Sequence, residues 1–216
     1  MTHDKRITLS TAGSRTAKQW PASTMMWSEF IERLRTPVRS TETVNEYLKL
    51  NKKQQDELKD VGGFVGGTLK DNRRKAGCVI GRDLLTLDMD NIPAGGTNSV
   101  LQRLESLGCA YAVYSTRKHR PDAPRLRAVF PINRTCTADE YEPLCRKLAA
   151  HIGIEYCDPT TFQVHRLMYW PSCCSDGEYV FNYADKPFID VDGTLALYIN
   201  CWDVTQWPEV PGAPAK

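Results

Sequence analysis

The sequence predicts an α+β fold in which helices pack on one face of a small, mainly antiparallel sheet. The first observation is the order of the expected elements between residues 78 and 183, which reads strand–strand–helix–strand–strand–helix–strand. Helices that follow pairs of strands, rather than single strands, are typical of α+β proteins. The second observation is that the clearest strands carry apolar side chains on one face only. With 216 residues, 41% of them hydrophobic and 25% charged, the chain is large enough for one substantial core.

Helical patterns precede this sheet and define a predicted N-terminal accessory region, residues 1–60. Residues 1–22 are rich in Ser, Thr and Lys, and we expect them to be loosely structured. Trp27–Arg35 places its large apolar side chains on one stripe, which predicts a short helix. A second, polar helix is expected to begin after Ser40 or Thr41 and to run along the surface toward residue 60.

The main domain is predicted to span residues 61–200, followed by a C-terminal tail at residues 201–216. It opens with Gly62–Gly67, which indicates a tight turn into a strand rather than a P-loop, because no Gly-Lys-Ser/Thr follows. The longest helix begins with a capping box from Thr137 to Glu140. Strands are expected at 78–81, 84–90, 110–115, 125–132, 166–170 and 178–183, and helices at 98–107 and 138–151.

The eight cysteines are interpreted as reduced side chains that fill apolar space. No signal peptide or transmembrane run is visible, so we expect a reducing, cytoplasmic location and no membrane partner. No Cys-x-x-Cys pair occurs, and the adjacent Cys173 and Cys174 are a poor arrangement for one tetrahedral ion. A zinc site built from Cys157, His165 and Cys173 is the alternative that we disfavour.

The charges are unevenly distributed although the net charge is only +2. Residues 117–127 carry five Lys or Arg against one acidic residue, and a second basic cluster lies at residues 70–75. From residue 176 to residue 209 the balance reverses to seven acidic residues and one lysine. This distribution indicates a localised anionic partner rather than a uniformly basic surface.

Asp88 and Asp90 carry the strongest functional signal, because they lie two residues apart on a predicted strand. Leu87 and Met89 then face the core while both carboxylates face the other side. Two carboxylates at the end of an apolar strand are unfavourable unless a cation compensates them. A divalent metal such as Mg²⁺ is the simplest such cation, because it is commonly held by one or two carboxylates together with substrate phosphates.

The strand that contains Arg125 and Arg127 repeats this alternation with basic side chains. If it lies in the same sheet as the aspartate strand, the guanidinium and carboxylate groups share one face. Carboxylates that hold a metal beside arginines that match phosphate oxygens form a site suited to a polyphosphate. A cross-strand ladder of salt bridges on a solvated face is the alternative.

Two further segments add polar groups to this predicted site. Ser115 to His119 lies where a strand ends and supplies hydroxyl groups, cations and a histidine, which are natural ligands for a triphosphate. Asp158 either caps a turn before Pro159 or provides the third carboxylate of a two-metal centre. Arg166 begins an apolar strand and can reach a phosphate, whereas the neighbouring His165 is interpreted as structural.

The combination of these motifs resembles the archaeo-eukaryotic primase superfamily, whose catalytic core is an RNA-recognition-like antiparallel sheet. More narrowly, it is similar to the primase-polymerase domain of prophage replication proteins of the virulence-associated E group. The resemblance covers most of residues 25–200 and includes the Trp27–Phe30 and Val61–Gly67 stretches. Its motifs are an Asp-x-Asp strand, a Ser/Thr-x-x-His hairpin that leads into Pro-Arg-x-Arg, and an Asp followed by Arg-x-x-Tyr-x-Pro.

The resemblance implies a role for each residue of these motifs. Asp88, Asp90 and Asp158 would bind two Mg²⁺ or Mn²⁺ ions. The remaining implied contacts, with the triphosphate of the incoming nucleotide, involve Ser115, Arg117, His119, Arg125, Arg127 and Arg166. The superfamily's second motif is usually Ser-x-His, so its first position is open here between Ser115, Thr116 and Arg117. Contacts with a nucleic-acid strand are expected from Arg73, Arg74, Lys118 and Arg120.

The sequence therefore predicts a nucleotidyltransferase that acts on a DNA template or primer with NTP or dNTP in phage or mobile-element replication. The resemblance also implies a helicase-type ATPase as a partner domain or subunit, for which the chain has no Walker motif of its own. Two other functions stay open. One is a nucleic-acid-binding module without catalytic activity, and the other is a metal-dependent nuclease.

Overall fold

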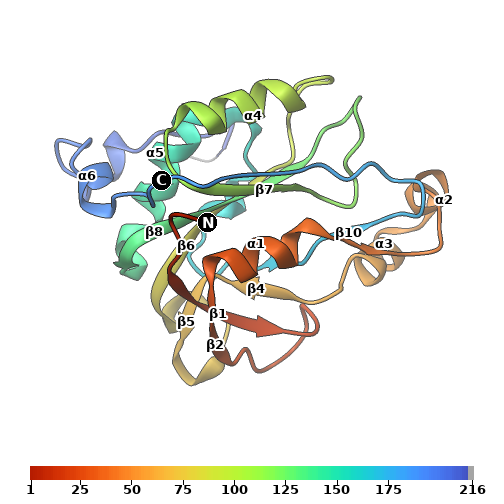
Figure 1. Ribbon diagram of the computed structural model, residues 1–216, viewed down its shortest axis with the longest axis horizontal. Coiled ribbons are helices and arrows are strands. Elements are labelled where there is room, and N and C mark those ends of the chain that lie inside the picture. Colours follow the sequence, from red (N-terminus) through yellow and green to blue (C-terminus); the bar gives the residue numbers. More distant parts are fainter. Residues whose placement is uncertain (214–216) are drawn as a thin grey trace.

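A five-stranded antiparallel sheet forms the centre of the molecule (Figure 1). The structure is a computed structural model and describes residues 1–213. The strands follow the order β11 (Phe181–Ala184), β7 (Tyr111–Ser115), β8 (Leu126–Cys136), β6 (Val79–Met89) and β5 (Gly67–Leu69). The expected α+β class with a mainly antiparallel sheet is confirmed.

Strands β6 and β8 are paired as the alternating sequence patterns require. Leu87 lies opposite Ala128, and Asp88 lies opposite Arg127. Because side chains alternate along a strand, Leu87 enters the core while Asp88 and Arg127 share the other face. The two strands expected at 78–81 and 84–90 are one strand with an irregularity between Arg82 and Leu84.

Helices α4 (Thr97–Ser106) and α5 (Ala138–Ile152) cover one face of the central sheet, as predicted. In Figure 1 they lie above the sheet. The capping box of α5 is present, since Glu140 N–H donates to Thr137 Oγ1 while the Glu140 carboxylate accepts from Thr137 N–H. The short helix α6 (Val191–Leu195) packs against the same core.

The opposite face of the central sheet is covered by a second sheet, which was not expected. Its strands follow the order β2 (Ala22–Met26), β1 (Arg6–Ala12), β4 (Gly63–Val65) and β9 (Met168–Tyr169), and helix α1 (Trp27–Arg35) packs beside them. The expectation that residues 1–22 are loosely structured is therefore wrong. Ile7 and Leu9 of β1 are buried against the central sheet, and two apolar side chains are a weak strand signal in a sequence.

The region before residue 60 is joined to the rest of the chain by strand pairing. Strand β1 pairs with β4, and β3 (Val38–Arg39) runs parallel to β10 (Ser172–Cys173). The predicted domain boundary at residue 60 remains a prediction, but both of these pairings join strands that lie on opposite sides of it in the sequence. The single helix expected toward residue 60 is two helices, α2 (Val44–Lys49) and α3 (Lys52–Leu58), because Leu50 and Asn51 are extended.

The remaining elements are short. In the described part of the chain, 3-10 helices span Lys70–Asn72, Ala76–Cys78, Ile154–Tyr156, Pro159–Phe162 and Val204–Gln206. The expected strands at 166–170 and 178–183 are shorter, as β9 and β11. All eight cysteines are free, and the predicted tail has its last three residues outside the described part. In residues 1–213, no helix is long and apolar enough to cross a membrane.

Candidate functional site

Two aspartate–arginine pairs lie at one end of the central sheet, where β6 ends and β8 begins. Asp88 Oδ2 lies 3.2 Å from Arg127 Nη2, and Asp90 Oδ2 lies 3.0 Å from Arg125 Nη1. The strand register brings the first pair together directly. Asp88 and Arg127 share one face of a common sheet as expected, whereas Asp90 and Arg125 lie just beyond the ends of their strands.

Asp158 joins this end of the sheet by pairing with the last residues of β6, on the side where β5 does not extend far enough to cover them. Its backbone N–H donates to Asp88 O at 2.9 Å, and Asp88 N–H donates to Thr161 Oγ1 at 2.9 Å. Asp158 Oδ1 caps the turn by accepting from Thr160 N–H at 2.8 Å, while Oδ2 lies 3.4 Å from Arg166 Nη2. The two sequence interpretations of Asp158 are thus compatible, because one oxygen caps and the other faces the site.

Asp88 is the least satisfied group of the site. It is 7% exposed, and neither its Oδ1 atom nor Arg127 Nε has a hydrogen-bond partner among the described residues. Burial raises the pKa of the Asp88 carboxyl; the charge of Arg127 opposes this shift, while Asp90 and Asp158 add to it by repulsion. A cation bound beside Asp88 would counteract both effects on the pKa, because it stabilises the charged carboxylate.

Two adjoining hollows are lined by these side chains. The first, of about 510 Å³, lies between the end of β7, helix α3 and residues 169–172, and the second, of about 560 Å³, reaches Asp88. Their common wall includes Asp90, Asp158, Arg127 and Arg166. Among the described residues that line the first hollow, seven are basic and three acidic, which favours an anionic ligand.

The residues present can accommodate a divalent metal, although they do not form a finished metal site. The unpartnered Asp88 Oδ1 and the mutual repulsion of three carboxylates fit the oxygen-rich donor set of Mg²⁺ or Mn²⁺. Within residues 1–213, however, no group of three or more His, Cys, Asp or Glu side chains is close enough to hold an ion. Arginine instead occupies one side of each carboxylate.

The hairpin that was expected to bind the triphosphate is only partly on the cavity wall. Ser115, Thr116 and Lys118 line the first hollow. His119 lines neither hollow in the described part of the chain; it is 2% exposed, and its Nδ1 accepts from Arg125 N–H at 3.1 Å. Burial lowers the pKa of His119, so the ring favours its neutral form and supports the start of β8.

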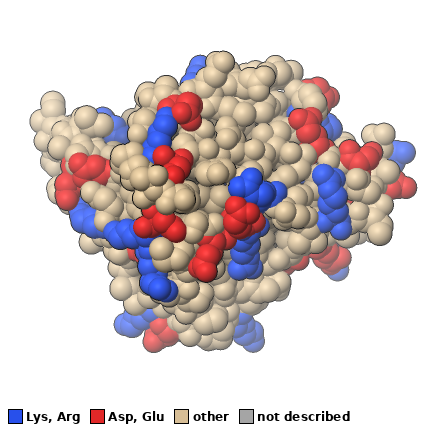
Figure 2. Space-filling model, in the orientation of Figure 1, with Lys and Arg blue, Asp and Glu red and all other residues tan. Residues whose placement is uncertain are grey.

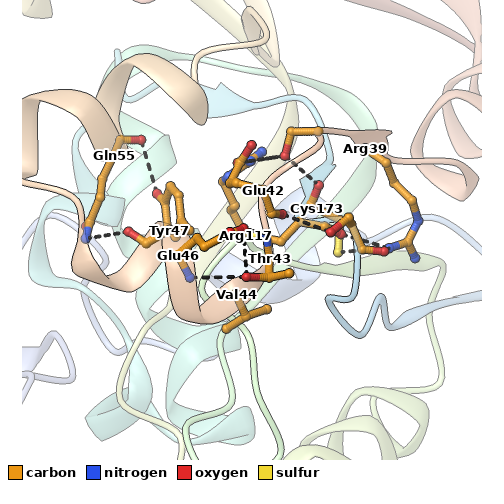
Figure 3. Close-up of polar contacts among 12 residues, drawn as sticks. Arg39, Glu42, Thr43, Val44, Glu46, Tyr47, Gln55, Arg117 and Cys173 are labelled. Atoms are coloured by element: carbon orange, nitrogen blue, oxygen red, sulfur yellow. Dashed lines mark hydrogen bonds and ion pairs between the residues drawn. The ribbon is translucent and has the colours of Figure 1, made fainter.

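Arg117 lies on the first hollow but is already engaged by the N-terminal region (Figure 3). Its guanidinium donates to Glu42 and Ser40 and lies 4.9 Å from the centre of the Tyr47 ring. The side chain is 3% exposed. Arg117 therefore connects the β7–β8 hairpin to α2 in this structure, and a direct contact with nucleotide remains a prediction.

The four residues expected to bind nucleic acid are dispersed. Arg74 lines the second hollow, and Lys118 lines the first. Arg73 lines a neighbouring hollow beside Arg74, whereas Arg120 forms an ion pair with Asp122 at 3.2 Å.

Sequence reasoning missed the contributions of the N-terminal region to both hollows. Lys52 and Lys59 of the α3 segment lie on the common wall, and Arg15 of the β1–β2 loop lies on the second hollow. The pKa of Lys118 is lowered by burial and by repulsion from Arg125, Lys59 and Lys52, which indicates that these cations converge. Apart from their charge, no local signal marks these side chains as site residues.

On the face that Figure 2 shows, basic and acidic side chains are interspersed in small groups. Fold and site together define an α+β protein with two adjoining hollows whose basic side chains outnumber the acidic ones, with Asp88, Asp90 and Asp158 among their lining residues. The chain belongs to the VapE N-terminal domain family, whose model matches residues 1–210. The predicted membership in the virulence-associated E group is thereby confirmed.

The chain is also similar to the AEP domain of the cyanophage S-2L primase-polymerase. The TM-score is 0.47 at 14% sequence identity, and the match covers 88% of each chain. No curated protein matches the chain.

Proposed function

We propose that this protein is a nucleotidyltransferase of the primase-polymerase type, which extends or starts a DNA-directed strand from NTP or dNTP. The observation that supports this most is the meeting of Asp88, Asp90 and Asp158 on two adjoining hollows in which basic side chains outnumber acidic ones. Carboxylates beside guanidinium groups suit a substrate that brings both phosphate and metal. The family membership and the motif order agree with this interpretation.

Asp88, Asp90 and Asp158 would hold two Mg²⁺ or Mn²⁺ ions. When bound, such ions activate a 3′-hydroxyl and stabilise the departing pyrophosphate. In the reaction, the 3′-oxygen forms a bond with the α-phosphorus while the bond to the β-phosphate oxygen breaks, and the hydroxyl proton is released.

The arginines exchange partners in this proposal. Arg125, Arg127 and Arg166 neutralise the carboxylates of the free protein and turn to the triphosphate when the substrate arrives with its metal. Ser115 at the end of β7 contributes a further donor, and so does Lys118, which the sequence assigned to nucleic acid but which lines the first hollow. Catalysis then depends on positioning and charge neutralisation, and no covalent nucleophile is required.

The test is a primer-extension and de novo synthesis assay with Mg²⁺ or Mn²⁺, using Asp88→Asn and Asp90→Asn. Each substitution is expected to lower kcat by about 10³-fold or more, because it removes metal-binding charge at nearly unchanged volume. Asp192→Asn, at an exposed position outside both hollows, serves as the matched control. Synthesis that survives the Asp88→Asn/Asp90→Asn double substitution would refute the assignment.

A nucleic-acid- or nucleotide-binding module without turnover is the second candidate. It is favoured by the arginine partner of each carboxylate and by the lack of a finished metal cluster within residues 1–213. Binding of labelled nucleotide that is indifferent to Mn²⁺, together with no synthesis, would support this module. Metal-dependent degradation of the primer without added nucleotide would instead identify a nuclease.

A helicase-type ATPase partner is part of the proposal and can be tested by co-purification.

A further inference from the structure

The two hollows differ in the residues that they do not share. The first reaches Ser115, Lys118 and Arg125 at the end of the central sheet. The second reaches Arg15, Arg74 and Asp88 instead. The common wall holds Asp90 and Asp158, so a ligand in either hollow would meet the other ligand at the carboxylates.

Arg15 is held at the second hollow by contacts at both ends of the residue. Its backbone N–H donates to Asp60 Oδ1 at 2.9 Å, and its Nη1 lies 3.3 Å from Asp56 Oδ2. The Arg15 side chain is still 34% exposed, so it remains accessible to a ligand. A preorganised arginine loses less freedom on binding phosphate than a free surface side chain does.

Arg74 continues this basic surface away from the carboxylates. Its Nη2 donates to Arg15 O at 3.3 Å, and its guanidinium lies 5.0 Å from the centre of the Trp20 ring. Its Nε atom is buried and has no hydrogen-bond partner in the described chain. The loop at 70–75 is fixed to the β1–β2 loop by Trp20 N–H, which donates to Asn72 O at 2.8 Å.

Beyond Arg74, a third hollow of about 500 Å³ is lined by three exposed cations, Lys18, Arg73 and Lys75. Asp71 and Asn72 adopt φ values of 53° and 54°, and the three basic residues that follow this left-handed turn all line the third hollow. Arg74 lines the second and the third hollows. The cations therefore form a continuous path that ends at the aspartates.

We propose that a single nucleic-acid strand follows this path from the 70–75 loop over Arg74 and Arg15 into the second hollow, and that the nucleoside triphosphate occupies the first hollow. A row of spaced cations matches the repeated charge of a strand backbone. In the first hollow, Lys118 and Arg125 line one cavity together with Lys52 and Lys59, which suits the compact charge of a triphosphate. The assignment rests on the proposed polymerase function for its pair of substrates.

The experiment measures two affinities separately, without turnover. A fluorescein-labelled single-stranded oligodeoxynucleotide is titrated by anisotropy at several salt concentrations, and a fluorescent dNTP is titrated with Mn²⁺. Arg15→Ala/Arg74→Ala is expected to weaken oligonucleotide binding about tenfold and to reduce the salt slope by about 1.4, as for two lost phosphate contacts. Its dNTP affinity should change less than about twofold. Lys118→Ala should show the opposite pattern.

Arg74 packs on Trp20, so replacing it can also disturb folding. A second variant therefore leaves the packed side chains unchanged. Lys18→Ala/Arg73→Ala/Lys75→Ala changes exposed side chains only and is expected to weaken oligonucleotide binding alone. Lys53→Ala, on the exposed side of α3, is the matched control with no expected effect. Unchanged oligonucleotide binding in both path variants, or equal weakening of both ligands, would overturn the assignment.

Failure of the proposed function is distinguishable from failure of this inference. Selective loss of oligonucleotide binding in a protein that never synthesises DNA would support the path and refute the polymerase. Normal synthesis with intact oligonucleotide binding in both path variants would refute the path alone.

Discussion

The two ends of strand β8 both place an arginine beside carboxylates, but the two clusters differ in how completely they are satisfied. Arg134 contacts Glu140 at 2.8 Å and Asp192 at 2.6 Å, and the Asp192 side chain is 74% exposed. Arg127 and Asp88 have side chains only 13% and 10% exposed and share one contact of 3.2 Å. Each also keeps a buried polar atom without a partner in the described chain.

The difference separates a structural ion cluster from the proposed binding site. At the Arg134 end, the hydrogen bonds from Arg134 lower the pKa values of Glu140 and Asp192, so the carboxylates are stabilised in their charged form. At the Arg127 end, burial raises the pKa of Asp88 even though a guanidinium lies beside it. Buried polar groups that the protein leaves unsatisfied are groups that a ligand can satisfy.

The largest expected effect is on stability. Arg127→Ala should lower the free energy of unfolding by about 3 kcal/mol at pH 7.5, because it leaves a buried carboxylate uncompensated. Arg134→Ala should lower it by about 1 kcal/mol or less, since that cluster is solvated. Urea denaturation measures both. Adding Asp88→Asn to Arg127→Ala should recover part of the loss, and equal losses at the two ends would contradict the comparison.

The next effect is stabilisation by metal. Mn²⁺ at about 100 times its dissociation constant should raise the free energy of unfolding by about 2.7 kcal/mol in the unsubstituted protein. This gain should disappear in Asp88→Asn and persist in Arg134→Ala, which thermal denaturation with and without EDTA can show. A gain that persists in Asp88→Asn would place the metal elsewhere.

The smallest expected effect is the opposite pH dependence of the two ends. Because the folded-state pKa of Asp88 is raised, the folded protein holds a proton that the unfolded chain loses. Its contribution to stability is therefore present below the ordinary aspartate pKa of about 4 and is lost as pH rises through the folded value. The slope should stay below the roughly 1.4 kcal/mol per pH unit that one full proton gives.

The contribution of Glu140 to stability depends on pH in the opposite direction. Its pKa is lowered, so its contribution is present above the ordinary glutamate value and is lost as the pH falls through the folded value. Melting temperatures measured from pH 3 to pH 8 check both signs. Their dependence on pH should become weaker above about pH 4 in Asp88→Asn and weaker below about pH 4 in Glu140→Gln. The same change in both variants would show that the two ends are equivalent.

The sequence alone determined which side chains of β6 and β8 face the site. Alternation along a strand is a local property of the backbone, so Asp88 could be placed on the face opposite Leu87, and Arg127 on the face opposite Ala128, before any pairing was known. The buried face of α1 was predictable for the same reason, because the apolar stripe of Trp27–Arg35 is local.

Only the tertiary structure decided which other segments reach those side chains. Asp158 meets Asp88 because its backbone pairs with the free edge of β6, and Arg15, Lys52 and Lys59 arrive from the region before residue 60. These contacts arise from strand pairing and packing between distant parts of the chain, which leave no periodic pattern in the sequence. Local periodicity therefore determined the faces, and long-range packing determined the composition of the site.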